Sequence, residues 1–233
     1  FKNEGLDFGK TEKIVNESLR KADDGELYLE FKQSESYVYD DKKIKNASTS
    51  TDKGFGLRSV KDETSAYSHS SDISETSIKN AGKTVQSILS SSSKSKIIDP
   101  IRTNKKHYSN LNPMNGFSSE QKTKLLKSID EYARKLDKRV KQVSASLHGE
   151  WQAVHILRKG GYHCGDIRPL VRLNISVTVD NGKRMETGSS GAGGRKNYTD
   201  FFNEKMIMFV STGFISFTYL HFLSVIAISF AFL

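Results

Sequence analysis

The sequence predicts an α+β protein in which amphipathic helices pack against antiparallel strands and hairpins. Segments with a helical period and segments with a strand period stand in separate blocks, and hairpin-type turns join the strand segments. The 233 residues are enough for one medium domain or two small ones. We expect two such subdomains, followed by a hydrophobic tail over residues 206–233.

The first subdomain is expected over residues 5–90. A short amphipathic helix over 11–22 comes first, and alternating apolar and polar residues over 26–32 then predict a half-buried strand. Two or three more strands follow the turn "DDKK" over residues 44–70, separated by "DKG" and "KDE". From about Ser71, apolar residues on one stripe predict a second helix.

Residues 91–116 are expected to link the two subdomains, because they are rich in Ser, Asn and Lys, lack a period and carry two of the three prolines. The second subdomain, over 117–204, opens with Ser118 and Gln121 at the spacing of a capping box, which satisfies free backbone N–H groups at a helix start. The helix that follows has an apolar face formed by Leu125, Leu126, Ile129, Tyr132, Ala133 and Leu136.

Strands follow this helix. The segments "VKQVSASL" and "WQAVHILR" flank residues 148–150, where we expect a hairpin turn. The segment over 170–180 alternates most regularly in the chain, and "DNGK" closes it with Asn-Gly, the strongest short hairpin signal. The glycine-rich segment that comes next, residues 188–194, is expected to be a loop.

This glycine-rich segment does not match a phosphate-binding loop. Gly188 and Gly193 have the spacing of that motif, but Gly194 stands where a lysine must reach the phosphates. No G-x-G-x-x-G is present either. We therefore interpret the segment as a mobile or closely packed loop.

Candidate metal ligands are few. His148 and Glu150 form the H-x-E of zinc deaminases, but that site also needs C-x-x-C, and Cys164 is the single cysteine. His163, Cys164 and Asp166 are metal-ligand types, yet neighbours on a turn rarely point at one ion, so we expect a turn with a buried thiol. No catalytic residue and no metal ligand set is predicted from the residues.

The formal net charge of +9 makes acidic partners worth considering. The basic residues are scattered along the chain, which is typical of a solvated surface, so we do not expect a nucleic-acid partner. One cysteine excludes an internal disulfide framework and is compatible with a reducing compartment.

Residues 206–233 contain no Asp, Glu, Lys or Arg, and they exceed the roughly 20 apolar residues that span a bilayer. One interpretation is a transmembrane anchor with Lys205 at the interface, diluted by six Ser and Thr residues. The other is the product of a shifted reading frame in an A/T-rich gene. Membrane association is expected only if the segment is a transmembrane anchor.

Several segments resemble the TldD/PmbA family of metallopeptidases, on the TldD side. "LDKRVKQVSASLHGEWQ", "DIRPLVRLNISVTV" and "METGSSGAGGR…YTDFF" resemble its central region, and "GELYLEF…DDKKIKNASTSTDKGFGLRSV…SAYS" resembles its N-terminal domain. The resemblance covers residues 5–204. The residues that carry its signature, without a known role, are Asp166, Arg168, Pro169, Leu170, Arg172, Gly188, Gly191, Gly193, Gly194 and Arg195.

The resemblance implies a cytoplasmic zinc peptidase that acts on unfolded or flexible peptides, holds the substrate through its backbone, and forms a homo- or hetero-oligomer with a TldD/PmbA-type sibling. In the family an H-E-x-x-x-H helix binds the zinc, and this motif lies C-terminal to everything matched here. No catalytic or metal residue can therefore be assigned, and we expect a truncated chain that binds no zinc and is inactive alone. The alternative is a non-enzymatic, partner-binding or membrane-tethered subunit of the same fold.

Overall fold

A computed structural model describes residues 1, 5–88 and 107–201. Within these residues, six strands form one sheet in the order β3-β2-β1-β4-β5-β6. The strands are β1 (Asp24–Asp40), β2 (Lys43–Lys61), β3 (Thr64–Ser70), β4 (Val140–Arg158), β5 (Tyr162–Asp180) and β6 (Met185–Gly194). The helices are α1 (Phe8–Ser18), α2 (Glu75–Ile88), the 3-10 helix η2 (Pro113–Gly116), α3 (Ser119–Leu136) and α4 (Tyr198–Phe201). The predicted α+β class is confirmed.

The chain forms two compact units, and each is assembled from separated stretches of sequence. The first unit draws on residues 1–33, 50–110 and 152–168, and the second on 34–49, 111–151 and the residues from 169 onward. Strands β1, β2, β4 and β5 contribute to both units, which accounts for their length of 17 to 19 residues. The domain boundaries expected from the sequence, 5–90 and 117–204, stay a prediction.

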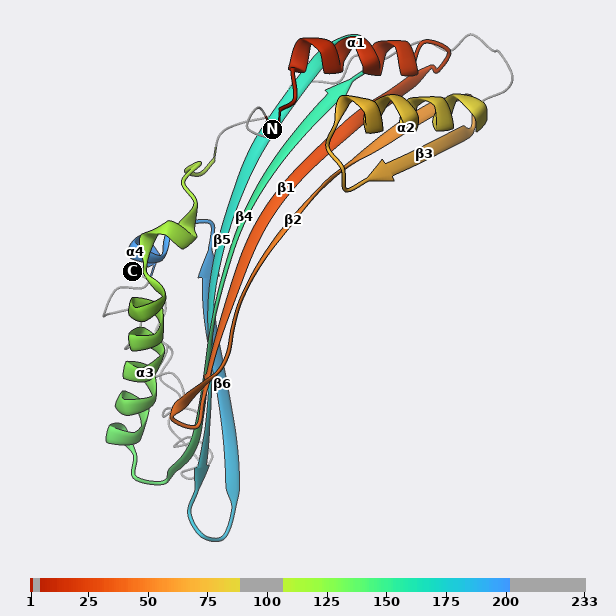
Figure 1. Ribbon diagram of the computed structural model, residues 1–233. Coiled ribbons are helices and arrows are strands. Elements are labelled where there is room, and N and C mark those ends of the chain that lie inside the picture. The colour runs from red at the N-terminus through yellow and green to blue at the C-terminus, as the bar shows by residue number, and fades with distance from the viewer. Residues whose placement is uncertain (2–4, 89–106, 202–233) are drawn as a thin grey trace. The chain divides into compact units, whose positions relative to one another are not determined.

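In the first unit, α1 and α2 lie side by side against the strands (Figure 1). The side chain of Asp7 caps α1 by accepting a hydrogen bond from the Lys10 backbone N–H at 3.1 Å. The predicted helix over 11–22 is confirmed, although it starts earlier and ends at Ser18. The core of this unit includes Val15, Leu19, Leu27, Leu29, Leu57, Ile78, Val85 and Leu157.

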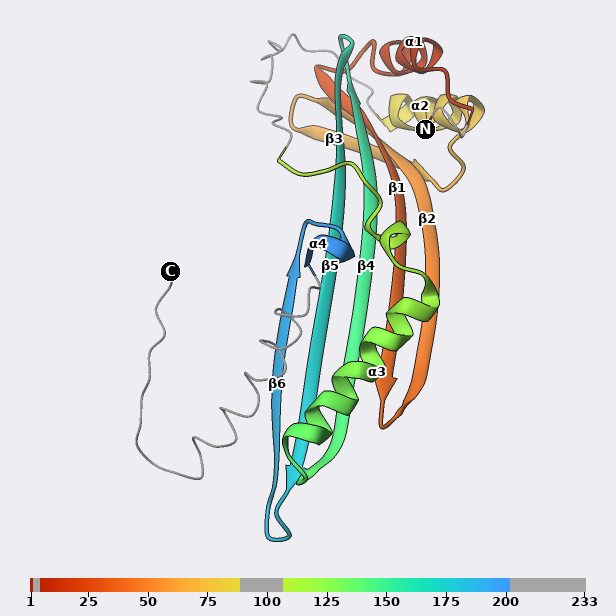
Figure 2. The ribbon, with the colours of Figure 1, turned by 90° about the vertical axis from the view of Figure 1, so that its left-hand side faces the viewer.

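In the second unit, α3 lies along one face of the strands (Figure 2). Its predicted capping box is present: Ser118 Oγ accepts from the Gln121 N–H at 3.2 Å, and Gln121 Oε1 accepts from the Ser118 N–H at 2.8 Å. Apolar residues of α3 meet alternate residues of the strands in a core that includes Leu126, Ile129, Ala133, Val143, Ala145, Leu147, Val171, Leu173 and Ile175.

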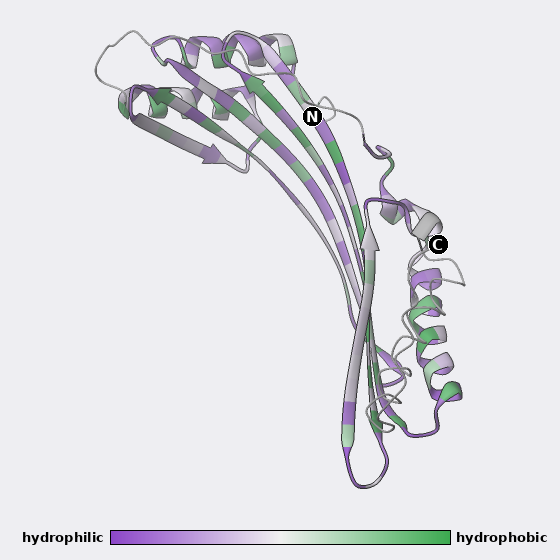
Figure 3. Cartoon of the chain, turned by 180° about the vertical axis from the view of Figure 1, so that it is seen from behind, coloured by the Kyte–Doolittle hydropathy of each residue, from purple (hydrophilic) through white to green (hydrophobic). Residues whose placement is uncertain are grey.

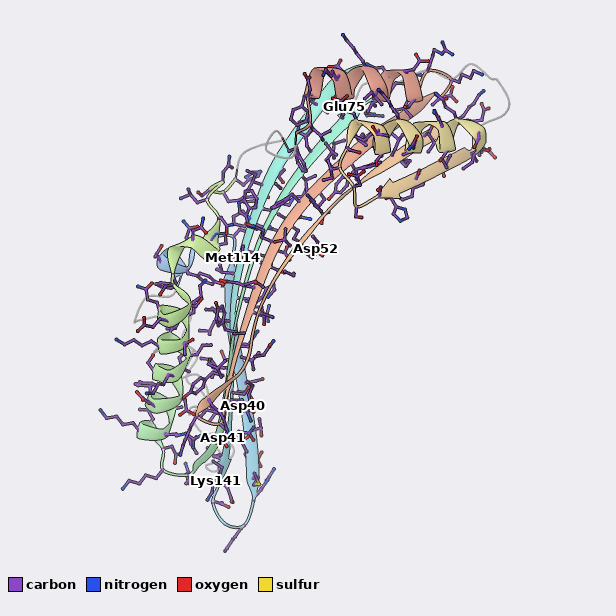
Figure 4. All side chains as sticks on the ribbon, viewed as in Figure 1. Asp40, Asp41, Asp52, Glu75, Met114 and Lys141 are labelled. Carbon is purple, nitrogen blue, oxygen red and sulfur yellow. The ribbon has the colours of Figure 1, made fainter. Side chains whose placement is uncertain are left out.

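Three of the predicted turns are confirmed. Asp41 and Lys42 have positive φ angles of 45° and 67° after β1, whose end is marked by Asp40 and Asp41 in Figure 4. Asp62 has a φ of 53° between β2 and β3. Gly182 has a φ of 84° in the "DNGK" turn between β5 and β6. Asp and Gly tolerate this left-handed region better than other residues.

The hairpin expected at 148–150 is wrong, because β4 runs straight through these residues. Gly149 is needed there for space: a Cβ at this position would collide with the hydroxyl of Tyr198. The turn expected at "DKG" is also wrong, because β2 runs through these residues. Gly54 lies inside β2, where a Cβ would stand 2.9 Å from the carbonyl oxygen of Ser70. A glycine within a strand often marks close approach of another group and not a turn.

The predicted turn at "HCGD" is also wrong, since these residues lie within β5 and Cys164 is only half-buried. The glycine-rich loop is instead strand β6, at the edge of the sheet. In Figure 3 most of β6 is nearly colourless, because Gly and Ser stand near the middle of the hydropathy scale. Its pattern therefore showed neither a strand nor a helix period.

The expected hydrophobic tail, residues 206–233, and most of the expected linker, residues 91–106, lie outside the described residues. In the part of the chain that the structure describes, no helix is both long and apolar enough to cross a membrane.

Candidate functional site

The signature residues separate into three groups. Asp166 and Arg168 lie in the first unit and form an ion pair, in which Arg168 Nε donates to Asp166 Oδ2 at 2.7 Å. The Tyr108 hydroxyl donates to the same carboxylate oxygen at 3.4 Å. The hydrogen bond to Asp166 raises the pKa of Arg168. The Tyr108 contact links β5 to the segment before η2.

A second group consists of Arg172, Gly191 and Gly193, which lie together in the second unit. Arg172 is directly opposite Gly193 in the antiparallel pair of β5 and β6, and Asn174 is opposite Gly191. Arg172 Nε donates to Asn174 Oδ1 at 2.9 Å. Directly opposite residues project from the same face of a sheet, so this arginine, this amide and the two glycines share one face.

The two glycines leave room for their neighbours on β5. A Cβ on Gly191 would stand 2.5 Å from Asn174 Oδ1 and 3.1 Å from the Leu173 carbonyl oxygen. A Cβ on Gly193 would stand 2.8 Å from the Val171 carbonyl oxygen. The distances of 2.5 and 2.8 Å are too short for a real Cβ atom. The two glycines therefore let β6 pack closely against β5 and let the Asn174 side chain lie across β6.

On this face the strands form an open hollow of about 410 Å³. Its lining is polar apart from one aliphatic residue and consists of Ser144, Ser146, Arg172, Asn174, Ile175, Ser176, Ser189, Ser190 and Gly191. The residues that alternate with them on β4 and β5 are buried in the core beneath α3. The hollow therefore lies on the face of these strands that α3 does not cover.

The remaining signature residues belong to neither group. Gly188 is buried opposite Val177, and Gly194 pairs with Val171, so both are on the core side of β6. Pro169 is buried, and its carbonyl oxygen accepts from Arg195 Nη1 at 3.3 Å. Leu170 is half-buried beside it. These positions support the packing of β5 and β6, and the family resemblance assigns them no role.

A buried ionic network, which the sequence analysis did not identify, lies in the second unit. Lys122 Nζ is 2.7 Å from Glu35 Oε1, with both side chains about 95% buried. Tyr198 donates its hydroxyl hydrogen to Glu35 Oε1 at 2.9 Å. The Lys122 ammonium also donates to the carbonyl oxygen of Met114, the residue marked on η2 in Figure 4, at 3.1 Å. Burial and the adjacent Glu35 carboxylate raise the pKa of Tyr198.

This network fixes Tyr198, four residues beyond the end of β6. The Lys122 ammonium lies over the Tyr198 ring at 5.4 Å, and Phe117 stacks on the same ring at 5.9 Å. The sequence contained a signal for this buried network. Lys122 stands four residues before Leu126 and seven before Ile129, so it lies on the apolar stripe of α3. A lysine on such a stripe suggests a buried partner.

Another cluster of polar side chains lies in the first unit. His155 Nε2 and His163 Nδ1 are 3.2 Å apart, and His163 Nε2 is 3.2 Å from Glu12 Oε2. Phe8 packs on the His155 ring at 4.6 Å. Burial, followed by the neighbouring His163, lowers the pKa of His155, so this ring is neutral near pH 7.

None of these groups fits a metal ion. Among the described residues, no three or more His, Cys, Asp or Glu side chains are grouped as a metal site requires. His163, Cys164 and Asp166 do not converge, because successive residues of a strand point to opposite faces. His163 pairs instead with His155 and Glu12.

This fold is known from solved structures of α+β proteins. A candidate modulator of DNA gyrase from Bacteroides thetaiotaomicron superposes with a TM-score of 0.68 at 14% identity, over 89% of this chain and 49% of that one. TldE from Thermococcus kodakarensis superposes equally well, over 87% of this chain and 46% of its own.

The sequence also matches two parts of one family. Residues 25–89 match domain 1 of the PmbA/TldA metallopeptidases, and residues 112–213 match their central domain. The metalloprotease TldD homologue of Buchnera aphidicola from Acyrthosiphon pisum is 35% identical over 187 residues, and that of Haemophilus influenzae is 36% identical over 192 residues. The chain belongs to the TldD/PmbA metallopeptidase family. The matched region covers 79% of this chain but only 38–39% of the length of these relatives.

Proposed function

We propose that this chain forms the N-terminal and central parts of a TldD-type zinc metallopeptidase that cleaves unfolded or flexible peptides. The observation that carries the proposal is the ordered match to domain 1 and the central domain of the family. The relatives named TldD metalloproteases support the reaction class. The zinc, the cytoplasmic location and the peptide substrate follow from the family resemblance and are part of the proposal.

The role proposed for these 233 residues is to bind peptide and partner, and not to break the peptide bond. A zinc peptidase needs ligands that hold the metal and a base that activates water. The sequence contains no H-E-x-x-x-H motif, so residues for this step are not among those present. A sibling chain of the TldD/PmbA type is the proposed partner, a choice supported by the likeness to TldE.

A second candidate is a non-enzymatic subunit of the same fold that binds partners. The open polar face of β4, β5 and β6 in the second unit is the observation in its favour, since it offers donors and acceptors without a metal. Both candidate functions include binding of a peptide or a partner by this chain. They differ in whether a metal-containing region works together with it.

Fluorescence anisotropy can test the peptide-binding role. A fluorescein-labelled linear peptide of ten residues is titrated with the 233-residue chain, and the same sequence closed into a head-to-tail ring serves as the control. We expect the linear peptide to bind and the ring to bind at least tenfold more weakly, because only a flexible chain can extend along the protein. Equal binding of both forms, or of neither, would contradict the proposed role.

A further inference from the structure

The hollow on β4, β5 and β6 is lined by hydrogen-bond donors and contains a single charged side chain, that of Arg172. Five serines and Asn174 are among its lining residues. Ser189 pairs with Ser176 on this face, whereas Ser190 pairs with the core residue Ile175. No carboxylate is among the lining residues. A pocket of this composition suits a small anionic group, because each oxygen of the anion can accept a hydrogen bond from the wall.

Arg172 differs from most other described arginines in its partner. Arg20, Arg58, Arg134, Arg139, Arg158, Arg168 and Arg184 each lie within ion-pair distance of an Asp or Glu. Within the described part of the chain, the side-chain partner of Arg172 is the neutral Asn174 amide. A neutral partner holds a guanidinium in place but leaves its charge uncompensated.

The contact with Asn174 also orients the guanidinium. Asn174 Oδ1 accepts from Nε at 2.9 Å, so the contact uses the side of the planar group. The two Nη nitrogens, which bind carboxylates as a fork, are not used in this contact. The absence of a Cβ on Gly191 provides the space in which Asn174 takes this position. The arginine is thus held in a defined place at the edge of a serine-lined hollow.

We propose that this hollow binds a carboxylate group of a peptide, with Arg172 as the charged anchor and the serines and Asn174 as its polar surroundings. A carboxylate carries one negative charge and matches the single positive charge of the lining. A phosphate group carries more charge than one arginine compensates. The choice of a peptide as the source of the carboxylate rests on the function proposed above.

A binding assay with three peptides tests this site. The peptides share one flexible ten-residue sequence with a fluorescent label and differ in their carboxylates. The first has a free C-terminus and a central Gln, and the second has an amidated C-terminus and a central Glu. The third has an amidated C-terminus and a central Gln, and is therefore neutral at both positions. We expect one of the two carboxylate-bearing peptides to bind at least several-fold more tightly than the neutral one, and the preferred peptide identifies a terminal or a side-chain carboxylate as the ligand.

The substitution Arg172→Gln should abolish this preference and weaken binding of the preferred peptide by roughly tenfold, which is the usual order for loss of a charge-assisted contact. Arg184→Gln is the matched control, because it removes the same charge from an exposed position in the β5–β6 turn, and it should leave the preference unchanged. Circular dichroism of both variants verifies that they are folded.

The outcomes separate the site from the proposed function. If all three peptides bind the wild-type chain equally, or if Arg172→Gln keeps the preference, the carboxylate site is wrong while the peptide-binding role stands. If no peptide binds, the peptide-binding role fails, and an NMR titration with acetate decides the site. Shifts of the Gly191 and Asn174 signals that disappear in Arg172→Gln support a carboxylate site, and their absence overturns it.

Discussion

Glu35 and Lys122 form the contact whose disruption we expect to cost the most stability. Each charge is almost fully enclosed, and each has the other as its main compensation. Removing one partner leaves an isolated charge in an apolar interior, whereas removing both leaves only polar neighbours to be satisfied.

Lys122→Met should therefore lower the free energy of unfolding by about 3–5 kcal/mol. The double variant Lys122→Met/Glu35→Leu should recover a large part of this loss, since no uncompensated charge is then buried. Denaturation by urea measures both values. A single variant that is as stable as the double variant would show that the two charges do not compensate each other.

The pair of Asp24 and Arg158 predicts a dependence on pH in the acid range. Arg158 Nε donates to Asp24 Oδ1 at 2.9 Å, and this hydrogen bond holds the pKa of Asp24 below its ordinary value of 3.8. A lowered folded-state pKa contributes stability above pH 3.8, and this contribution is lost as the pH falls through the folded-state pKa.

We expect Asp24→Asn to destabilise the protein at pH 7 and to approach the wild type as the pH falls below 3.8. Thermal unfolding at a series of pH values follows the difference. A constant difference across the acid range would mean that this carboxylate is not stabilised by Arg158.

At the scale of the elements, the start of α3 is the feature that the sequence predicted most accurately. A capping box depends on residues only three positions apart, so the local sequence contains all the information needed. The same holds for the turns after Asp40, after Lys61 and at "DNGK", where Asp, Lys or Gly adopts a positive φ.

The missed features depend on contacts that are distant in the sequence. Gly149 was interpreted as part of a turn, although its role is to accept the Tyr198 ring, 49 positions away. The hollow around Arg172 combines three strands, and the alternation on β5 predicted which side chains are exposed but not what lies beside them. The burial of Glu35 likewise depends on α3, which no local pattern of β1 indicates.

Loss of the cap on α3 gives a quantitative check of its role. Ser118→Ala should reduce stability by about 1 kcal/mol, because the Gln121 N–H loses its acceptor. Ser128→Ala, on the exposed surface of the same helix, should change it much less. An equal effect of both substitutions would contradict the capping role.

The pairing of β5 with β6 depends on Gly193. A Cβ there would be 2.8 Å from the Val171 carbonyl oxygen, so Gly193→Ala should cost about 1–3 kcal/mol through crowding. Hydrogen exchange should also speed up at the backbone amides of β6 relative to those of β1. Ser190→Ala on the same strand is the control, since it adds no atom, and it should leave the exchange of β6 unchanged.

At the scale of the whole chain, the sequence lacks the motif that would bind zinc and activate water. We therefore expect the purified 233-residue chain to retain far less than one zinc per molecule after dialysis against zinc, measured by atomic emission. It should also leave a linear fluorogenic peptide intact with zinc present. Stoichiometric zinc together with hydrolysis that a chelator stops would contradict this expectation.

The long strands shared by the two units restrict how relatives of this protein can differ in length. In β1, Leu27 and Leu29 enter the core of the first unit, and Tyr37 and Tyr39 enter that of the second. Because side chains alternate with a period of two, inserting one residue between the two pairs would turn one pair away from its core. Gaps of odd length in an alignment of relatives should therefore fall in the turns and be absent between Leu29 and Tyr37.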